Sequence, residues 1–120
     1  SIKKFKTPEI IDPSSWWKDT TKVGGGWRNS NWFGAFLIYP QTDWIFHSKL
    51  GWIYTVSDES EGLWLWSSQH GWLWTKKGVW PFLYSNRSSN WFYFVMQING
   101  HPVFFDYGQK SYVSNSPTGL

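Results

Sequence analysis

Aromatic and aliphatic residues alternate in short runs along the middle of the chain, and small polar residues separate the runs. The clearest run-turn-run unit occurs twice, as WIFHSKLGWIYT at 44–55 and WLWSSQHGWLWT at 64–75, 20 residues apart. In each copy an aromatic–aliphatic–aromatic run leads into a polar turn that ends in Gly, and a second such run follows. Alternation with a period of two is typical of β-strands, so each copy predicts a β-hairpin.

The same pattern extends, less regularly, to both sides of this pair. Residues 82–85 (FLYS) match 64–67 (WLWS), and weaker matches lie at 36–39 and 103–106. The runs predicted as strands are 27–28, 32–39, 44–47, 52–56, 63–66, 72–75, 80–84, 91–98, 102–106 and 110–113. No segment has helical periodicity over three turns. The sequence therefore predicts an all-β fold, an antiparallel meander of aromatic hairpin repeats of about 20 residues that forms a twisted sheet, a barrel or a short solenoid.

The turns of the two clearest copies end in Gly51 and Gly71, just before the returning strand. A Gly at that point suits a type I turn followed by a bulge residue with positive φ. The acidic loop at 57–62 ends in Gly62 and is expected to follow the same rule.

The chain divides by composition into three parts. Residues 1–26 hold several Lys, two Pro and the triplet Gly24-Gly25-Gly26, which predicts a linker or irregular segment with an edge strand near 9–11. Within it, Trp16-Trp17 is expected to sit on a strand, one ring capping the core and the other facing outward. Residues 27–113 form the Trp-rich β-repeat domain, and 114–120 are a tail.

Period two also divides the side chains between two faces of the predicted sheet. One face is almost wholly aliphatic, and we expect its residues Ile45, Ile53, Leu65 and Leu73 to form the core. The other face is almost wholly aromatic, and its rings either wedge between neighbouring hairpins or form a solvent-facing platform. The candidate binding residues are Trp44, Trp52, Tyr54, Trp64, Trp66, Trp72, Trp74, Tyr84 and Trp91.

Charge and composition exclude several function classes. Of the net charge of +3, residues 1–22 carry +2, from five Lys against three acids, so the repeats are close to neutral. A nucleic-acid partner is disfavoured, because duplex binding concentrates Lys and Arg on the folded body. No run approaches the roughly 18 apolar residues of a membrane-spanning helix, and the chain has no Cys.

The titratable residues do not form a recognisable catalytic or metal-binding motif. Asp43, Asp58, Glu59 and Glu61 fall in predicted loops, where Asp is a common turn former. His47, His70 and His101 do not recur at metal-ligand spacing. We therefore expect no catalytic residue, no metal and no cofactor, and the protein is not expected to be an enzyme.

Binding is the remaining role for so many rings. A pyranose offers an apolar C–H face that stacks on an aromatic plate and hydroxyls that hydrogen-bond to Asn, Gln, Ser and Asp. Equivalent sites 20 residues apart suit a repeating polymer, because linked weak sites gain avidity. The basic residues His47, Lys49, Lys76, Lys77 and Arg87 would favour an acidic or sulfated polysaccharide.

Five short segments resemble the sequences of a known family: 51–54 (GWIY), 63–66 (LWLW), 70–75 (HGWLWT), 80–84 (WPFLY) and 104–108 (FFDYG). They resemble a Trp-rich module at the C-terminal ends of large secreted or surface bacterial proteins, over about 27–113. This resemblance implies an accessory role within a larger multidomain protein that is secreted or on the cell surface. A looser likeness is to choline-binding aromatic hairpin repeats of cell-wall proteins; their Trp-Tyr-Tyr core is missing here, so choline binding is not carried over.

Together these features predict a non-catalytic carbohydrate-binding module that recognises a polysaccharide through exposed aromatic side chains. The alternative is a structural, anchoring or protein-interaction module whose rings serve only to stack hairpins or to dock a protein partner.

Overall fold

The computed structural model describes residues 15–114, which form eleven strands in a single antiparallel sheet. Strands adjacent in sequence are adjacent in the sheet throughout, so the topology is a pure meander, as predicted. The strands are β1 (Thr21–Gly24), β2 (Trp27–Ser30), β3 (Gly34–Ile38), β4 (Trp44–His47), β5 (Gly51–Ser57), β6 (Gly62–Ser67), β7 (Gly71–Lys76), β8 (Phe82–Ser85), β9 (Asn90–Ile98), β10 (His101–Asp106) and β11 (Ser111–Ser114). The described residues contain no helix.

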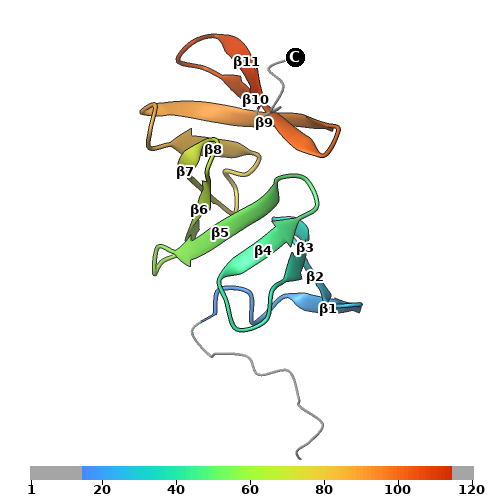
Figure 1. Ribbon diagram of the computed structural model, residues 1–120. Coiled ribbons are helices and arrows are strands. Elements are labelled where there is room, and N and C mark those ends of the chain that lie inside the picture. Colours follow the sequence, from blue (N-terminus) through green and yellow to red (C-terminus); the bar gives the residue numbers. More distant parts are fainter. Residues whose placement is uncertain (1–14, 115–120) are drawn as a thin grey trace, which may run out of the picture.

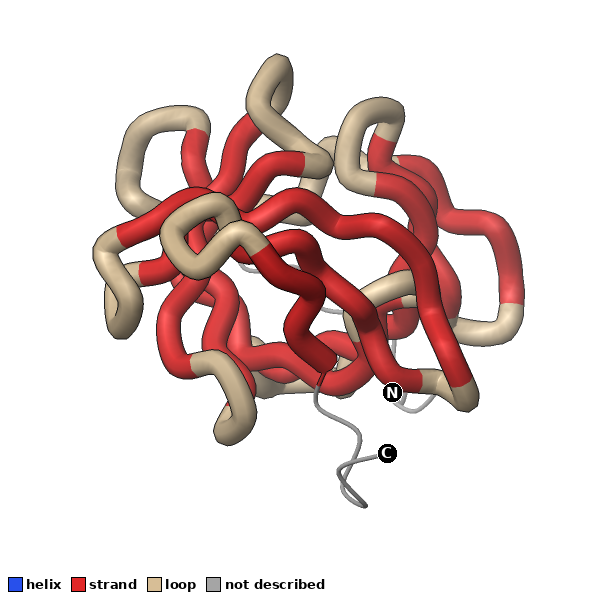
Figure 2. The backbone as a smooth tube through the Cα atoms, turned by 90° about the horizontal axis from the view of Figure 1, so that it is seen from above, coloured by secondary structure: helices blue, strands red, loops and turns tan. Residues whose placement is uncertain are grey.

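The sheet coils on itself without closing. In Figure 1 the chain passes from β1 at one end of the molecule to β11 at the other, and these two strands remain the free edges of the sheet. Figure 2 shows the strands winding about a common axis, with most hairpin turns at the periphery. The architecture is therefore an open, twisted and coiled sheet and not a barrel.

The concave, inner face of the coil forms the core. Ile45, Ile53, Leu65 and Leu73 are all buried, as expected. The cluster around them continues the same face, with Leu83, Phe92, Phe94 and Phe104. The outer face carries the larger rings, and bulky side chains need the wider, convex side. Together with the natural right-handed twist of strands, this difference in size favours coiling toward the aliphatic face.

Five hairpins share one turn device. They are β2–β3, β4–β5, β6–β7, β8–β9 and β10–β11, and the last residue of the first strand in each accepts backbone N–H groups of its own turn. We name these five the turn-capping residues: Ser30, His47, Ser67, Ser85 and Asp106. Four of them are buried. The N–H groups of the turn therefore satisfy the hydrogen-bonding capacity of a buried polar side chain, and the side chain in return holds the turn in one conformation.

The glycines that end these turns have the predicted geometry. Gly51 has φ 78° and Gly71 φ 69°, the left-handed region that residues with a Cβ avoid. Gly62 is different and corrects our expectation, because its φ is not positive. A Cβ there would overlap the Asp58 carboxylate and the Trp74 indole, so close approach is what requires glycine at this position.

The segment predicted as linker contributes to the fold. β1 pairs with β2, and Gly24-Gly25-Gly26 shapes the tight turn between them and is not a spacer. Trp16 and Trp17 lie in a turn, not in a strand; Trp17 is buried, and Trp16 packs on Phe36 with a ring-centroid distance of 5.1 Å. The Arg28 guanidinium lies over the Trp17 ring, 4.9 Å from its centroid. The strand predicted near 9–11 lies outside the described residues.

Candidate functional site

The outer face of the coiled sheet carries all nine aromatic candidates. Cross-strand register places Trp44 opposite Tyr54, Trp64 opposite Trp74, Trp66 opposite Trp72 and Tyr84 opposite Trp91. Trp52 lies opposite Phe46 on the same face. The period-two assignment of the rings to one face is therefore correct.

Most of these rings are half-buried against one another. Trp44, Tyr54, Trp64, Trp66 and Trp72 form one group of edge-to-face contacts, with centroid distances of 5.4–6.5 Å. A second group joins Trp74, Tyr84 and Trp91. Among the nine, Trp52 at 53% and Trp91 at 40% are the exposed rings. The face is thus a layer of interlocked rings that is open to solvent at selected edges.

A shallow groove of about 350 Å³ crosses this layer, lined by Val56, Trp64, Trp72 and Asn86. The two indole planes are at 88° with centroids 6.4 Å apart, so the edge of one ring faces the plane of the other. The Asn86 backbone N–H donates to the Trp72 carbonyl oxygen (3.0 Å), which holds residue 86 beside Trp72 at the groove. The groove therefore combines two aromatic surfaces with one neutral hydrogen-bonding group.

Two groove residues are absent from the candidates chosen on the sequence. Val56 could have been found, because it continues the alternation of Trp52 and Tyr54 on β5. Asn86 follows the turn-capping Ser85 in the β8–β9 turn, and only the packing of that turn against β7 brings it to Trp72. Of the nine candidates, Trp64 and Trp72 line the groove.

Asp58 orients one of the rings. Its carboxylate accepts the Trp74 indole N–H at 3.0 Å and the backbone N–H groups of Ser60 and Gly62. The Trp74 hydrogen bond, followed by those of the backbone, lowers the pKa of Asp58. A residue that the sequence places among solvated turn acids therefore positions part of the outer face.

His47 is a structural residue and cannot contact a ligand. It is fully buried, its Nε2 donates to the Phe33 carbonyl oxygen (2.7 Å), and its Nδ1 accepts the backbone N–H groups of Lys49 and Leu50. Burial, partly opposed by the Phe33 hydrogen bond, lowers its pKa to about 4, so the ring is neutral at pH 7. The expectation that His47 adds positive charge to a glycan site is therefore wrong.

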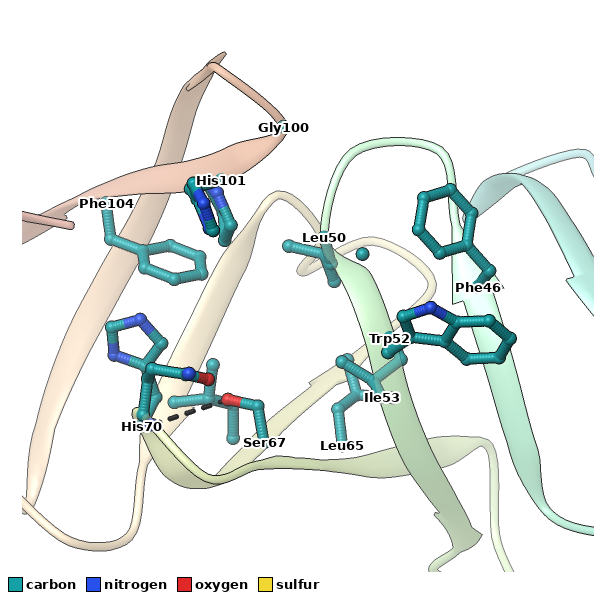
Figure 3. A pocket seen from close by; sticks show the side chains of 14 residues that line it. Phe46, Leu50, Trp52, Ile53, Leu65, Ser67, His70, Gly100, His101 and Phe104 are labelled. Atoms are coloured by element: carbon teal, nitrogen blue, oxygen red, sulfur yellow. Dashed lines mark hydrogen bonds between the residues drawn. The ribbon is translucent and has the colours of Figure 1, made fainter. Parts of the chain in front are cut away.

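A second site, the inner pocket, lies between the β4–β5 turn, the β6–β7 turn and the β9–β10 hairpin. Its volume is about 230 Å³. Figure 3 shows His70 beside Phe104 on one side, His101 and Gly100 above, and Leu50 and Trp52 toward the other side. The lining includes no Asp, Glu, Lys or Arg.

His70 differs from His47, although both lie at hairpin turns: His47 is the last residue before the β4–β5 turn, and His70 is the last residue of the β6–β7 turn. Its Nε2 is buried without a hydrogen-bond partner, and its ring packs edge-on against Phe104 with centroids 5.0 Å apart. Burial, aided by the charge of Arg87, lowers the pKa of His70 to about 4. The ring is thus a neutral imidazole with unused hydrogen-bonding capacity at the wall of a pocket.

Comparisons with protein-family models, curated proteins and solved structures find no match to this chain. Within 15–114, no three His, Asp or Glu side chains lie close enough to hold a metal ion together. The same residues include no helix of the length and hydropathy that crossing a membrane requires. The functional argument therefore depends on the geometry of the groove and the inner pocket.

Proposed function

We propose that the protein is a non-catalytic carbohydrate-binding module that recognises a polysaccharide on its aromatic outer face. The observation that carries the proposal is the Trp64–Trp72 groove, which two nearly perpendicular indoles line together with Asn86. One indole would stack on the apolar face of a pyranose while the other contacts its edge. The Asn86 side chain would hydrogen-bond to a hydroxyl, since an amide offers both donor and acceptor groups.

The groove favours a neutral polymer over an acidic or sulfated one. Val56, Trp64, Trp72 and Asn86 carry no charge. Arg87, the candidate cation that follows Asn86 in the chain, donates to the Gln69 carbonyl oxygen (2.9 Å) in the neighbouring turn. An anionic sugar in the groove would lose hydration without a counter-charge among the lining residues.

The carboxylates support a binding role over a hydrolytic one. Asp58 and Asp106 use their oxygens to accept N–H groups of turns and of Trp74. A glycosidase needs two carboxylates facing one cleft, and neither lines the groove. With the resemblance to Trp-rich modules of secreted and surface bacterial proteins, this supports an accessory module of a larger, secreted or surface protein.

The proposal is tested with Trp64→Ala and Trp72→Ala against Tyr112→Ala, an exposed ring on β11 that lies outside the groove. Affinity electrophoresis against neutral, acidic and sulfated polysaccharides identifies the polymer, and titration calorimetry measures affinity. Each groove variant should bind about tenfold more weakly or worse, as for other central aromatic anchors. Tyr112→Ala should bind normally.

A single result would sink the proposal: no polymer of any charge class retards the folded protein or alters its tryptophan fluorescence. Wild-type binding in both groove variants would equally contradict the assigned site.

The second candidate is a protein-interaction or anchoring module. The observation in its favour is a set of exposed apolar residues away from the groove, on β9 and β11: Val95, Met96, Ile98 and Tyr112. β11 is also a free sheet edge, to which a partner strand could add. Loss of a protein partner, but not of polysaccharide, on substituting Met96 and Ile98 would favour this function.

A further inference from the structure

The inner pocket is built by a hairpin that bends across the coil. β9 and β10 pair regularly until Phe94↔Phe104, and the next pair is Met96↔Val103, so Val95 is an extra residue that forms a bulge. Bulges bend and twist a strand. Beyond it the hairpin reaches the β4–β5 turn, where the Gln97 side-chain amide donates to the Ser48 carbonyl oxygen at 2.7 Å. His101 and Pro102 are thereby placed over the pocket.

We propose that the inner pocket receives one uncharged sugar ring, the terminal unit of the polysaccharide whose internal units occupy the Trp64–Trp72 groove. This rests on the proposed function and adds to it a second subsite and a chain-end specificity.

The size of the pocket limits the ligand. At about 230 Å³ it lies below the roughly 300–1,000 Å³ of pockets that hold drug-sized molecules. A single pyranose ring fits that volume, and a disaccharide would have to extend out of it. The exposed lining residues Trp52, Gln69 and Gly100 mark the side on which the pocket meets solvent.

The chemistry of the lining favours a neutral polyhydroxylated ring. Leu50, Leu73 and Phe104 supply apolar walls, and Gln69 and two imidazoles supply polar groups. A carboxylate or sulfate would enter a pocket whose lining has no cationic side chain to pair with it. A hydroxyl can donate to or accept from a neutral imidazole, whichever nitrogen carries the proton.

His70 provides the most specific indication of a ligand. Its Nε2 is a buried polar atom with no partner among the described residues, and an unsatisfied buried polar group carries a free-energy cost. A hydroxyl bound there would satisfy it, so occupancy would remove the cost.

A row of rings links the two subsites. Trp52 lines the inner pocket and lies two residues from Tyr54 on the same face of β5. Tyr54 contacts Trp72 with a centroid distance of 6.5 Å, and Trp72 forms the groove with Trp64. A glycan that extends from the pocket past Trp52 along β5 would therefore pass Tyr54 before it reaches the groove.

The test uses D-glucose, D-galactose, D-mannose and N-acetyl-D-glucosamine as probes, with D-glucuronate as the charged counterpart. Ligand-observed saturation-transfer NMR detects weak binding, and the imidazole resonances of ¹⁵N-labelled His70 report on the pocket itself. At least one neutral monosaccharide should bind and shift the His70 signals, and D-glucuronate should not. His70→Phe and Trp52→Ala should each weaken that binding about tenfold.

Two variants separate this proposal from the broader one. Trp64→Ala should lose polymer binding and keep monosaccharide binding. Tyr112→Ala, an exposed ring on β11 that lines neither site, should keep both. Circular dichroism checks that each variant is folded. The pocket proposal is overturned if no neutral monosaccharide shifts His70, or if Trp64→Ala and His70→Phe affect the monosaccharide equally.

Discussion

At the scale of single residues, His47 and His70 show how context decides the role of one residue type. Both rings are held neutral by burial, with the pKa of each lowered to about 4. His47 has partners on both nitrogens, the Phe33 carbonyl oxygen and the N–H groups of its turn. His70 has a buried nitrogen without one. The first imidazole completes the core, and the second lines a pocket.

Stability should fall as the pH drops from about 6.5 to about 4. Above 6.5 His47 is neutral in both states; below it the unfolded chain binds a proton that the folded protein excludes until pH 4. From that pKa difference, His47 alone should lower the free energy of unfolding by about 3 kcal/mol, after which its contribution is constant. Urea unfolding at pH 7 and pH 4.5 measures the loss. An NMR titration of His47 in the folded protein with a midpoint near 6.5 would contradict the assignment of this loss to the lowered pKa of His47.

At the scale of elements, the hairpin is the repeating unit and its turn-capping residue is the recurrent local signal. Ser67 and Ser85 were visible as a repeated Ser after an aromatic run, and Gly51 and Gly71 as turn endings. The common role of Ser, His and Asp at this position was not visible. Three different side chains perform it, and what they share is an acceptor atom aimed at the turn N–H groups.

Removing a turn cap should cost stability in proportion to its hydrogen bonds. Ser85→Ala removes one acceptor, for the Ser88 N–H, and should cost about 1 kcal/mol. Asp106→Ala removes a charged acceptor of two N–H groups, those of Gly108 and Gln109, and should cost about 2 kcal/mol. Ser68→Ala, at an exposed turn position, is the matched control and should change stability by less than about 0.5 kcal/mol. Equal losses in all three variants, measured by urea unfolding, would refute the shared role.

At the scale of the whole molecule, coiling converts a two-faced sheet into an inside and an outside. The inner face buries Leu and Phe side chains completely, whereas the outer rings are covered mainly by one another. Neighbours in the chain therefore differ sharply: Phe92 is 4% exposed and Trp91 40%. Each hairpin buries its inner face against its neighbours, so the stability of one hairpin depends on the hairpins beside it.

That difference predicts unequal costs for adjacent aromatic residues. Phe92→Ala should lower the free energy of unfolding by about 3–5 kcal/mol, because it leaves a cavity between Phe104 and the His70 ring. Trp91→Ala removes a larger ring that is partly exposed to solvent, and it should lower the free energy of unfolding clearly less. Thermal and urea unfolding of the two variants under one condition provide the comparison, and a larger loss for Trp91→Ala would reverse the assignment of the faces.

The sequence by itself determined the strands, the two faces and the core residues such as Leu65, because period two and turn glycines act locally along the chain. It missed β1, since Thr21–Gly24 has no alternation to distinguish it from a linker. Only the tertiary structure decided that the sheet coils without closing, that Trp52 is exposed while Trp64 meets Trp72 and Asn86 at a groove, and that His70 and His101 share a pocket. These features depend on the accumulated twist of the sheet and on contacts such as Gln97 to Ser48, 49 residues apart, which no local pattern encodes.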